Sequence, residues 1–377
     1  MMFNTTLDQE YNRWKFKRVI DKLIYLCSPN NTTKYELENI LERWMINMSN
    51  LTILEFKNDT STTPIDIYQK TSFDNDVNQK FLSELNEKRI FNSNYKRTFF
   101  VIFILKLSYL YLDHVQYRNK TIVFADNNTD KILLIDKNTF NYKLFTKSFH
   151  EKRFNLLQRI TNITTLDIAK MFLRYESIIL KGQQWHVPLS VFRYCYKNYD
   201  ARIEGFASPL NSQLLKVALE EDKSDSKQVK PNIKFCSMYP DTDAPFGSIG
   251  SFFDLRLEDI NCTTVLVNPP FIEDILRRTV LKMQELIEIA EIREPSRHLR
   301  FVTIMPYWSD YLYINRLKEY KHTVYYKILN RNSYYYEKYG SKIHANFDSI
   351  FFIIEKTDGF ENVHKYSDLV KFFRKRA

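Results

Sequence analysis

The sequence has few cysteines and no apolar run long enough to cross a membrane. Its cysteines are scattered and show neither metal-ligand spacing nor a disulfide framework, which favours a reducing intracellular compartment. The apolar run 99–105 meets Lys106 after too few residues to span a bilayer. Charged residues interrupt the first helical stretch, so no signal peptide is predicted. We therefore expect a soluble intracellular protein, nuclear or cytoplasmic. The cysteines are Cys27, Cys195, Cys236 and Cys262.

Composition indicates a folded protein with a basic surface. The chain has 377 residues, of which 44% are hydrophobic and 15% aromatic. This is typical of globular proteins, and the length favours two domains. Lys and Arg number 55 against 45 Asp and Glu, which gives a net charge of +10. Such an excess suits a polyanionic partner, although a basic surface without a ligand is the alternative.

Apolar spacing predicts a mostly helical first domain, residues 1–180, with a small β-hairpin. The second helix should begin at a capping-box pattern formed by Thr33 and Glu36. The helix at 95–113 is apolar nearly all round and is therefore expected to be buried. The other predicted helices are 8–28, 76–89, 151–162 and 165–179, and the hairpin pairs 121–125 with 131–135.

Residues 181–377 alternate short apolar strands with helices, which predicts an α/β, doubly wound sheet. Seven strands are expected, and the last two should pair antiparallel. The predicted strands are 202–206, 234–238, 251–255, 264–267, 301–305, 323–328 and 349–354.

One strand, Val265–Val267, ends abruptly in Asn268-Pro269-Pro270-Phe271. This tetrapeptide resembles the catalytic motif of methyltransferases that act on planar exocyclic amines. The carbonyls of Asn268 and Pro269 would accept the two amine N–H groups, and Phe271 offers a face for base stacking. Consecutive prolines stiffen the turn and remove competing donors. The alternative is a strand-to-turn junction without chemistry.

Three further motifs precede this tetrapeptide in a fixed order: FASPLN at 206–211, YPDTD at 239–243 and FGS at 246–248. Together they resemble the cap-specific adenosine N6-methyltransferases, the family of the phosphorylated-CTD-interacting factor. The resemblance continues through Met305–Trp308 and His344–Asn346 to Asp358–Phe360, so it covers roughly residues 185–365. The joint match is more specific than any single motif.

The resemblance implies a class I, Rossmann-like methyltransferase domain behind the helical domain. It would transfer a methyl group from S-adenosyl-L-methionine to N6 of the first transcribed adenosine, beside a 7-methylguanosine cap. In the family's better-known animal member a WW module precedes the core, and we expect that module to be missing here. There is accordingly no direct sign of binding to the phosphorylated polymerase tail.

The cofactor residues implied by the family lie at the carboxyl ends of the first two predicted strands, where ligands bind in such sheets. Asp241 and Asp243 would accept the ribose hydroxyls; a Pro-Asp turn is the alternative. No glycine lies inside the FASPLN turn, which on its own would be read as an ordinary turn. The remaining cofactor candidates are Phe206, Ala207, Ser208, Pro209, Asn211 and Asn268.

The substrate candidates are less specific. Glu273 matches a family glutamate that faces the substrate, but could be a helix N-terminal acid. Trp308 either lines the adenine pocket or packs in the core. His344 either lies near the substrate or has a structural role. Arg18, with Arg13 and Lys17, is a candidate for cap binding, and a solvated charged face is the alternative.

The chemistry suggested by these motifs needs no metal and no strong base, because sulfonium methyl transfer depends mainly on alignment. Capped RNA is the expected partner; no membrane or metal is expected. Two rival functions stay open. One is N6-adenine methylation of internal or uncapped RNA, or of DNA; the other is a catalytically inactive RNA-binding subunit.

The tyrosine run 334–336, beside Arg331 and Lys338, suits binding to single-stranded RNA; core packing is the alternative.

Overall fold

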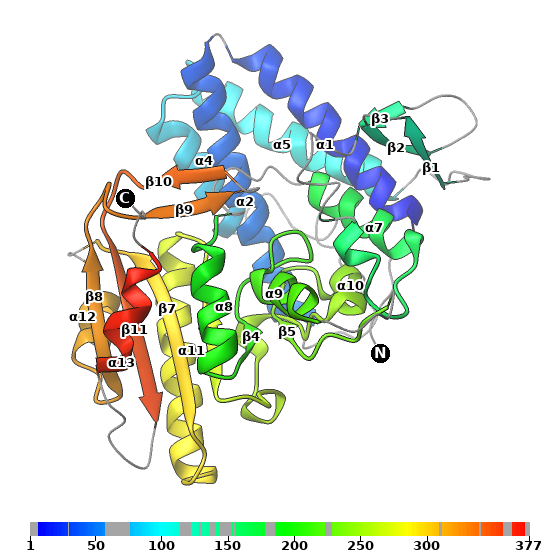
Figure 1. The fold of residues 1–377 in the computed structure, drawn as a ribbon. Helices are drawn as coiled ribbons and strands as arrows, with labels where there is room; N and C mark the ends of the chain where they lie inside the picture. Colours follow the sequence, from blue (N-terminus) through cyan, green and yellow to red (C-terminus); the bar gives the residue numbers. More distant parts are fainter. Residues whose placement is uncertain are drawn as a thin grey trace. The chain divides into compact units, whose positions relative to one another are not determined.

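The computed structural model describes residues 7–28, 30–56, 76–113, 122–127, 130–135, 141–143, 153, 155–177, 185–222, 228–308, 311–338, 341–356 and 364–373. The chain divides into two compact units (Figure 1). The first comprises Met1–Thr146 with Thr165–Lys181, and the second Lys147–Thr164 with Gly182–Ala377. This division differs from the predicted boundary at residue 180, because residues 147–164 belong to the second unit.

The first unit combines helices with a small antiparallel sheet. Its helices are α1 (Leu7–Cys27), α2 (Asn31–Phe56), α4 (Asp76–Glu87), α5 (Asn94–Asp113) and α7 (Thr165–Glu176). Strands β1 (Ile122–Asn127) and β2 (Asp130–Ile135) form the predicted hairpin, and β3 (Asn141–Lys143) adds a third strand. Within the described residues, no helix combines the length and apolarity needed to cross a membrane.

Two local predictions in this unit are wrong. Helix α2 begins before the predicted capping box, because the Asn30 side chain accepts a hydrogen bond from the Thr33 amide at 2.8 Å. Helix α5 is not buried all round: Val101 is inaccessible, whereas Tyr95 is 78% exposed and Phe99 is 58% exposed. The apolar content of this helix therefore overstated its burial.

The second unit contains a six-stranded sheet in the order β5-β4-β6-β7-β11-β8. Strands β5, β4, β6 and β7 are parallel, and β11 runs antiparallel to both β7 and β8. The predicted antiparallel pairing of the last two long strands is confirmed. The strands are β4 (Ala201–Glu204), β5 (Lys234–Phe235), β6 (Thr264–Val267), β7 (Leu299–Pro306), β8 (Thr323–Leu329) and β11 (Ser349–Lys356).

The predicted strand at 251–255 is wrong, so the described sheet has six strands and not seven. Residues Phe252–Asp254 form a 3-10 turn that Ser251 caps by accepting the Phe253 amide. Gly250, at φ 102°, bends the chain immediately before it. Local capping thus outweighs the strand preference of two adjacent phenylalanines.

Helices cover both faces of this sheet. Helices α8 (Leu189–Asn198), α9 (Gln213–Glu221) and α13 (His364–Lys371) contribute to one apolar core. Helices α11 (Glu273–Arg293) and α12 (Leu312–Lys318) contribute to the core on the other face. Strands β9 (Tyr335–Lys338) and β10 (Ser341–His344) form a short hairpin in the connection between β8 and β11.

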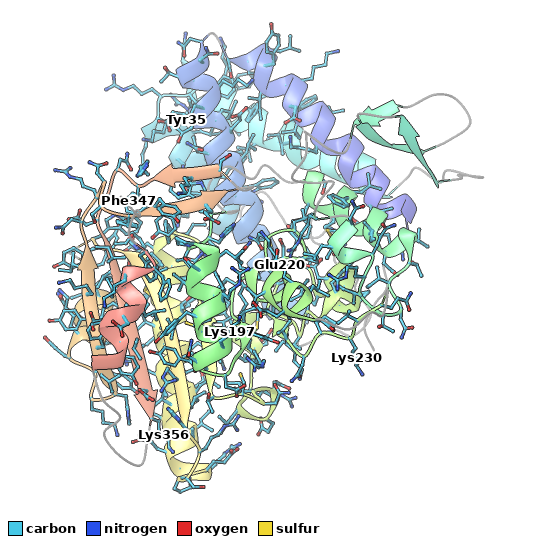
Figure 2. All side chains as sticks on the ribbon, viewed as in Figure 1. Tyr35, Lys197, Glu220, Lys230, Phe347 and Lys356 are labelled. Atoms are coloured by element: carbon cyan, nitrogen blue, oxygen red, sulfur yellow. The ribbon has the colours of Figure 1, made fainter. Side chains whose placement is uncertain are left out.

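A buried charge cluster lies near the carboxyl end of β11, next to Lys356, which Figure 2 labels. Glu355, which is 3% exposed, accepts hydrogen bonds from Arg300 at 2.5 Å and from His298 and Tyr366. Burial alone would raise the pKa of Glu355, but these hydrogen bonds and the Arg300 charge lower it from 4.5 to about 2. The carboxylate is therefore stabilised in its ionised form.

We expect Glu355→Gln to lower the free energy of unfolding at pH 7 by about 3 kcal/mol, because it leaves the Arg300 charge buried without its partner. The depressed pKa places this stabilisation above about pH 4.5, and it is lost as the pH falls towards 2. Urea unfolding at pH 7 and pH 3.5 measures the difference in unfolding free energy between wild type and variant, and this difference should be smaller at pH 3.5. Glu258→Gln, which removes an exposed ion pair with Arg293, is the control. A difference in unfolding free energy that does not change with pH would contradict this explanation.

Candidate functional site

The carboxyl ends of β4, β6 and β7 lie at one edge of the sheet because these strands are parallel neighbours. The turn 206–211 follows β4, Asn268–Phe271 follows β6, and Trp308 follows β7. The structure therefore brings together three of the segments that the sequence identified. Ligands in open α/β sheets bind at such an edge.

Asn268 has a fixed orientation at this edge. Its Nδ2 donates to the Trp185 carbonyl at 3.0 Å. Because a carbonyl accepts and cannot donate, the amide nitrogen must face Trp185, and Oδ1 is turned elsewhere. Oδ1 is buried and accepts no hydrogen bond from any described residue. An unsatisfied buried acceptor costs roughly 1–3 kcal/mol, so its retention needs an explanation.

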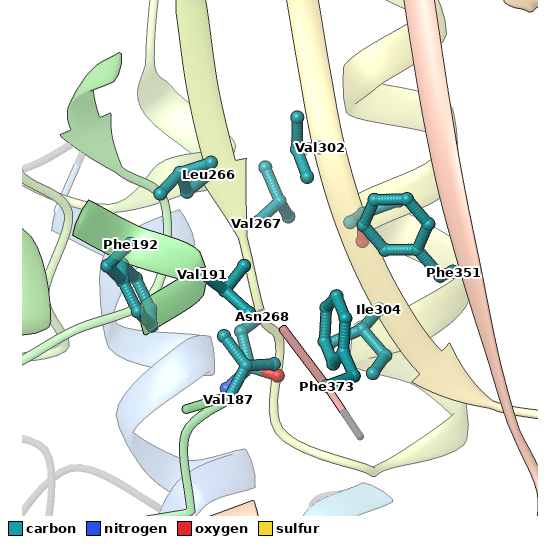
Figure 3. Close-up of a pocket in the computed structure, with 11 residues that line it drawn as sticks. Val187, Val191, Phe192, Leu266, Val267, Asn268, Val302, Ile304, Phe351 and Phe373 are labelled. Carbon is teal, nitrogen blue, oxygen red and sulfur yellow. The ribbon is translucent and has the colours of Figure 1, made fainter. Parts of the chain in front are cut away.

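Asn268 also lines a pocket that is otherwise mostly apolar (Figure 3). Val187 and Val191 line it from the segment before and within α8, and Phe373 from the chain after α13. Such surroundings strengthen any hydrogen bond that Oδ1 accepts, because little water competes there. Of the two prolines, Pro270 already accepts the Ile272 amide at 2.8 Å. No hydrogen bond within the described part of the chain uses the buried Pro269 carbonyl.

Phe271 belongs to an aromatic group around this turn. Its half-buried ring lies 5.6 Å from Tyr336 and 5.7 Å from Phe347, in edge-to-face geometry. The Trp185 ring lies 5.8 Å from Tyr336. These contacts fix the plane of Phe271 while leaving part of the ring accessible.

The turn after β4 is closed by its own polar groups. Asn211 Oδ1 accepts from the Ser208 amide at 2.7 Å and the Ser208 hydroxyl at 3.0 Å. The acceptor of Asn211 is therefore used within the turn, and its amide NH₂ is what remains for a ligand. Phe206 packs 5.0 Å from Phe252, while Ala207 is half-buried and Pro209 is buried.

Glu204 and Gly205, just before this turn, were not identified from the sequence. Glu204 accepts from the Ser212 hydroxyl at 2.8 Å and from the Leu214 amide at 3.2 Å. Burial raises the pKa of Glu204 to about 7, with these hydrogen bonds opposing the rise. A Cβ on Gly205 would lie 2.9 Å from the Phe252 ring, so only glycine allows this close approach. A glycine inside the predicted strand 202–206 was the available signal.

The two aspartates after β5 differ in exposure. Both lie in the short helix α10 (Pro240–Asp243), where Asp241 is half-buried and Asp243 is completely buried. Asp243 accepts the Thr242 hydroxyl at 3.2 Å. Asp241 is therefore the better placed of the two to reach a ligand.

The remaining substrate candidates lie on three segments, at the start of α11, after β7 and on β10. Glu273 is exposed at the first residue of α11, and Trp308 is half-buried, 5.1 Å from Tyr311. Burial raises the pKa of Tyr313 and the Glu273 carboxylate adds to the rise, so Glu273 lies near this aromatic group. His344 is exposed on β10 opposite Tyr335, and no contact within the described residues joins it to Asn268–Phe271.

The tyrosine run 334–336 is mainly structural. The hydroxyl groups of Tyr334 and Tyr336 lie 2.7 and 2.8 Å from the Ser349 hydroxyl, and both rings are buried. Of the three, Tyr335 alone is partly exposed. Core packing, the alternative reading, is therefore correct for two of these residues.

The cap-binding candidates lie in the first unit. Lys17 forms an ion pair with Asp21 at 2.5 Å, which reduces its availability for a phosphate. The side chains of Arg13 and Arg18 lie outside the described residues. Among the described residues, no group of three or more His, Cys, Asp or Glu side chains is arranged to hold a metal ion.

Comparison with known proteins identifies the family. The family model "Phosphorylated CTD interacting factor 1 WW domain" matches residues 139–339, more than half of the 377 residues. The chain belongs to this family. The matched range includes β4 to β8 and the motifs around the sheet edge.

Two curated relatives, from mouse and human, are each named mRNA (2'-O-methyladenosine-N(6)-)-methyltransferase. Each is 29% identical over 129 residues, which is 34% of this chain. The matched part spans only 15% of each relative.

Proposed function

We propose that this protein transfers a methyl group from S-adenosyl-L-methionine to N6 of the first transcribed adenosine, beside a 7-methylguanosine cap. The observation that carries the proposal is the buried Oδ1 of Asn268, which has no hydrogen-bond partner among the described residues and lies at the sheet edge beside Phe271. The named activity of the two curated relatives supports the same reaction class.

The geometry suits an exocyclic amine as the acceptor. Its nitrogen lone pair is delocalised into the ring, so the amine is a weak nucleophile. Asn268 Oδ1 and the Pro269 carbonyl would each accept one N–H, which favours the pyramidal nitrogen of the transition state. Because the Trp185 carbonyl already orients Asn268, little reorganisation is needed when the amine arrives.

Phe271 would hold the base. Its ring packs in edge-to-face geometry with Tyr336 and Phe347 and stays half-buried, so part of it is accessible to a ligand. Base–aromatic stacking contributes roughly 1–3 kcal/mol. Glu273 and Trp308 lie at the same sheet edge and are proposed as further substrate contacts, and His344 as a more distant one.

The residues after β4 and β5 fit a nucleoside cofactor. Gly205 allows the turn to pack closely, the Asn211 amide is available as a donor, and Asp241 is accessible to ribose hydroxyls. S-adenosyl-L-methionine would supply an electrophilic methyl group at this edge. The sheet order, with β11 inserted antiparallel between β7 and β8, supports a class I methyltransferase domain with one strand fewer than expected.

We expect Asp241→Asn to raise the Kd for S-adenosylhomocysteine at least about tenfold, because a hydrogen bond to a charged group contributes roughly 1.5–3 kcal/mol. Calorimetry measures this directly. The control is Asp259→Asn, which affects an exposed ion pair with Arg256. It should bind S-adenosylhomocysteine with the Kd of wild type. An unchanged Kd in Asp241→Asn would place the ribose contact elsewhere.

The cap requirement is tested with two A-starting RNAs that differ only in the cap. We expect loss of the cap to lower kcat/KM at least about tenfold, or about 1.4 kcal/mol of transition-state binding. Higher salt should weaken both RNAs alike, because phosphate contacts release counterions whether or not a cap is present. The net charge of +10, which belongs to the whole chain, suits a polyanionic partner, and assistance by the helical unit in RNA binding is part of the proposal.

Equal kcat/KM for capped and uncapped RNA would favour N6-adenine methylation of internal or uncapped RNA, or of DNA. RNA binding without any methyl transfer would instead favour the inactive RNA-binding subunit.

A further inference from the structure

Arg153 is a buried cation that holds the turn after β4 from outside. It is 4% exposed. Its Nε donates to the Pro209 carbonyl at 2.6 Å, and its Nη2 donates to the Ser212 carbonyl at 2.9 Å. The two acceptors lie three residues apart along the chain, so one guanidinium spans the end of the turn.

The cost of burying this charge indicates that the contact is specific. Desolvation lowers the pKa of Arg153 to about 10, with the nearby charges of Glu204 and Glu220 opposing the fall. The group therefore stays protonated at neutral pH, and the rigid fork of arginine suits two acceptors better than a single ammonium group does.

Glu204 holds the same backbone by the opposite kind of contact. It accepts the Ser212 hydroxyl and the Leu214 amide, while Arg153 donates to carbonyls. Ser212 is thus held by the Arg153 guanidinium at its carbonyl and by the Glu204 carboxyl group at its hydroxyl. It also caps α9 by accepting the Leu215 amide. A turn without internal glycine is fixed in this way by side chains from outside it.

We propose that Arg153 is a positioning residue for the cofactor: it fixes the 206–212 backbone in the conformation that S-adenosyl-L-methionine requires. This inference rests on the proposed function, because it assumes that the cofactor lies against this turn. Arg153 does not itself touch the reacting atoms. It acts through the Pro209 and Ser212 carbonyls, and its removal should affect cofactor binding more than RNA binding.

The test compares Arg153→Met, Arg153→Lys and Arg159→Met in the full chain. Arg159 is a matched control because its Nη1 donates to the Leu219 carbonyl at 2.9 Å, near the other end of α9. We would measure the Kd for S-adenosylhomocysteine, the KM for S-adenosyl-L-methionine and for capped RNA, and the Tm.

We expect Arg153→Met to raise the cofactor Kd and KM at least about tenfold, with the KM for RNA within about threefold of wild type. Arg153→Lys should show an intermediate change, since an ammonium group keeps the charge but not the fork. Arg159→Met should bind the cofactor normally.

Cofactor binding by Arg153→Met within about threefold of wild type would overturn the inference, as would an equal loss of cofactor and RNA affinity. If Arg153→Met does not fold, Arg153→Lys decides: wild-type affinity in that variant contradicts the role. Failure of the wild-type protein to bind S-adenosylhomocysteine would instead remove the proposed function and this inference with it.

Discussion

Replacing Asn268 by alanine is expected to lower kcat about a hundredfold while leaving the fold intact. The variant removes the acceptor proposed to bind one amine N–H as the nitrogen attacks. Loss of one oriented polar contact in a transition state costs about 3 kcal/mol. The variant also loses the Nδ2 hydrogen bond to the Trp185 carbonyl, which costs roughly 0.5–1.5 kcal/mol. Oδ1 has no hydrogen-bond partner to lose within the described residues, so the protein should still fold. Single-turnover rates with saturating RNA and cofactor measure the effect.

Two variants sharpen this prediction. Asn268→Asp keeps an acceptor but places its second oxygen against the Trp185 carbonyl, so an intermediate rate is expected. Asn198→Ala removes a similar side-chain contact, to the Tyr194 carbonyl in α8, and should react normally. Turnover of Asn268→Ala within about threefold of wild type would exclude Asn268 from the chemistry.

Phe271→Ala is expected to lower kcat/KM for RNA by about tenfold to a hundredfold. The estimate corresponds to the loss of one base–aromatic stack, roughly 1–3 kcal/mol. Phe271→Tyr keeps the ring and should retain most of the activity. Steady-state kinetics with varied RNA concentration separates this effect from cofactor binding.

The control for Phe271 is its neighbour Phe347. Phe347→Leu removes an edge contact to Phe271 at 5.7 Å without removing the proposed stacking face. It should lower stability more than activity. If Phe347→Leu and Phe271→Ala lose the same activity and the same stability, Phe271 packs the core and does not bind the base.

The strand elements of the site could be predicted because their signals are local. The strand Thr264–Val267 was predicted with its observed bounds, since two prolines prevent its continuation. The strand predicted at 251–255 failed because Ser251 caps a 3-10 turn, which apolar content alone does not reveal. Asn211 stays a predicted ligand contact, but through its NH₂ group, because its acceptor closes its own turn.

The residues that sequence reasoning missed act across long separations in the chain. Trp185 contacts Asn268 through its main-chain carbonyl, so its residue type carries no signal for that contact. Arg153 lies 56 residues before Pro209, and no spacing rule connects them. Gly205 was detectable in principle, because a glycine inside a predicted strand often marks a close approach of another group.

The central claim is methyl transfer to N6 of a cap-adjacent adenosine, and one measurement tests it most directly. The protein is incubated with labelled S-adenosyl-L-methionine and a capped RNA that begins with adenosine, and the digested nucleosides are identified by mass spectrometry. We predict N6-methyladenosine at the first nucleotide, with Asn268→Ala as the inactive control. Absence of the label from RNA, or its presence only on ribose or on internal positions, would contradict the claim.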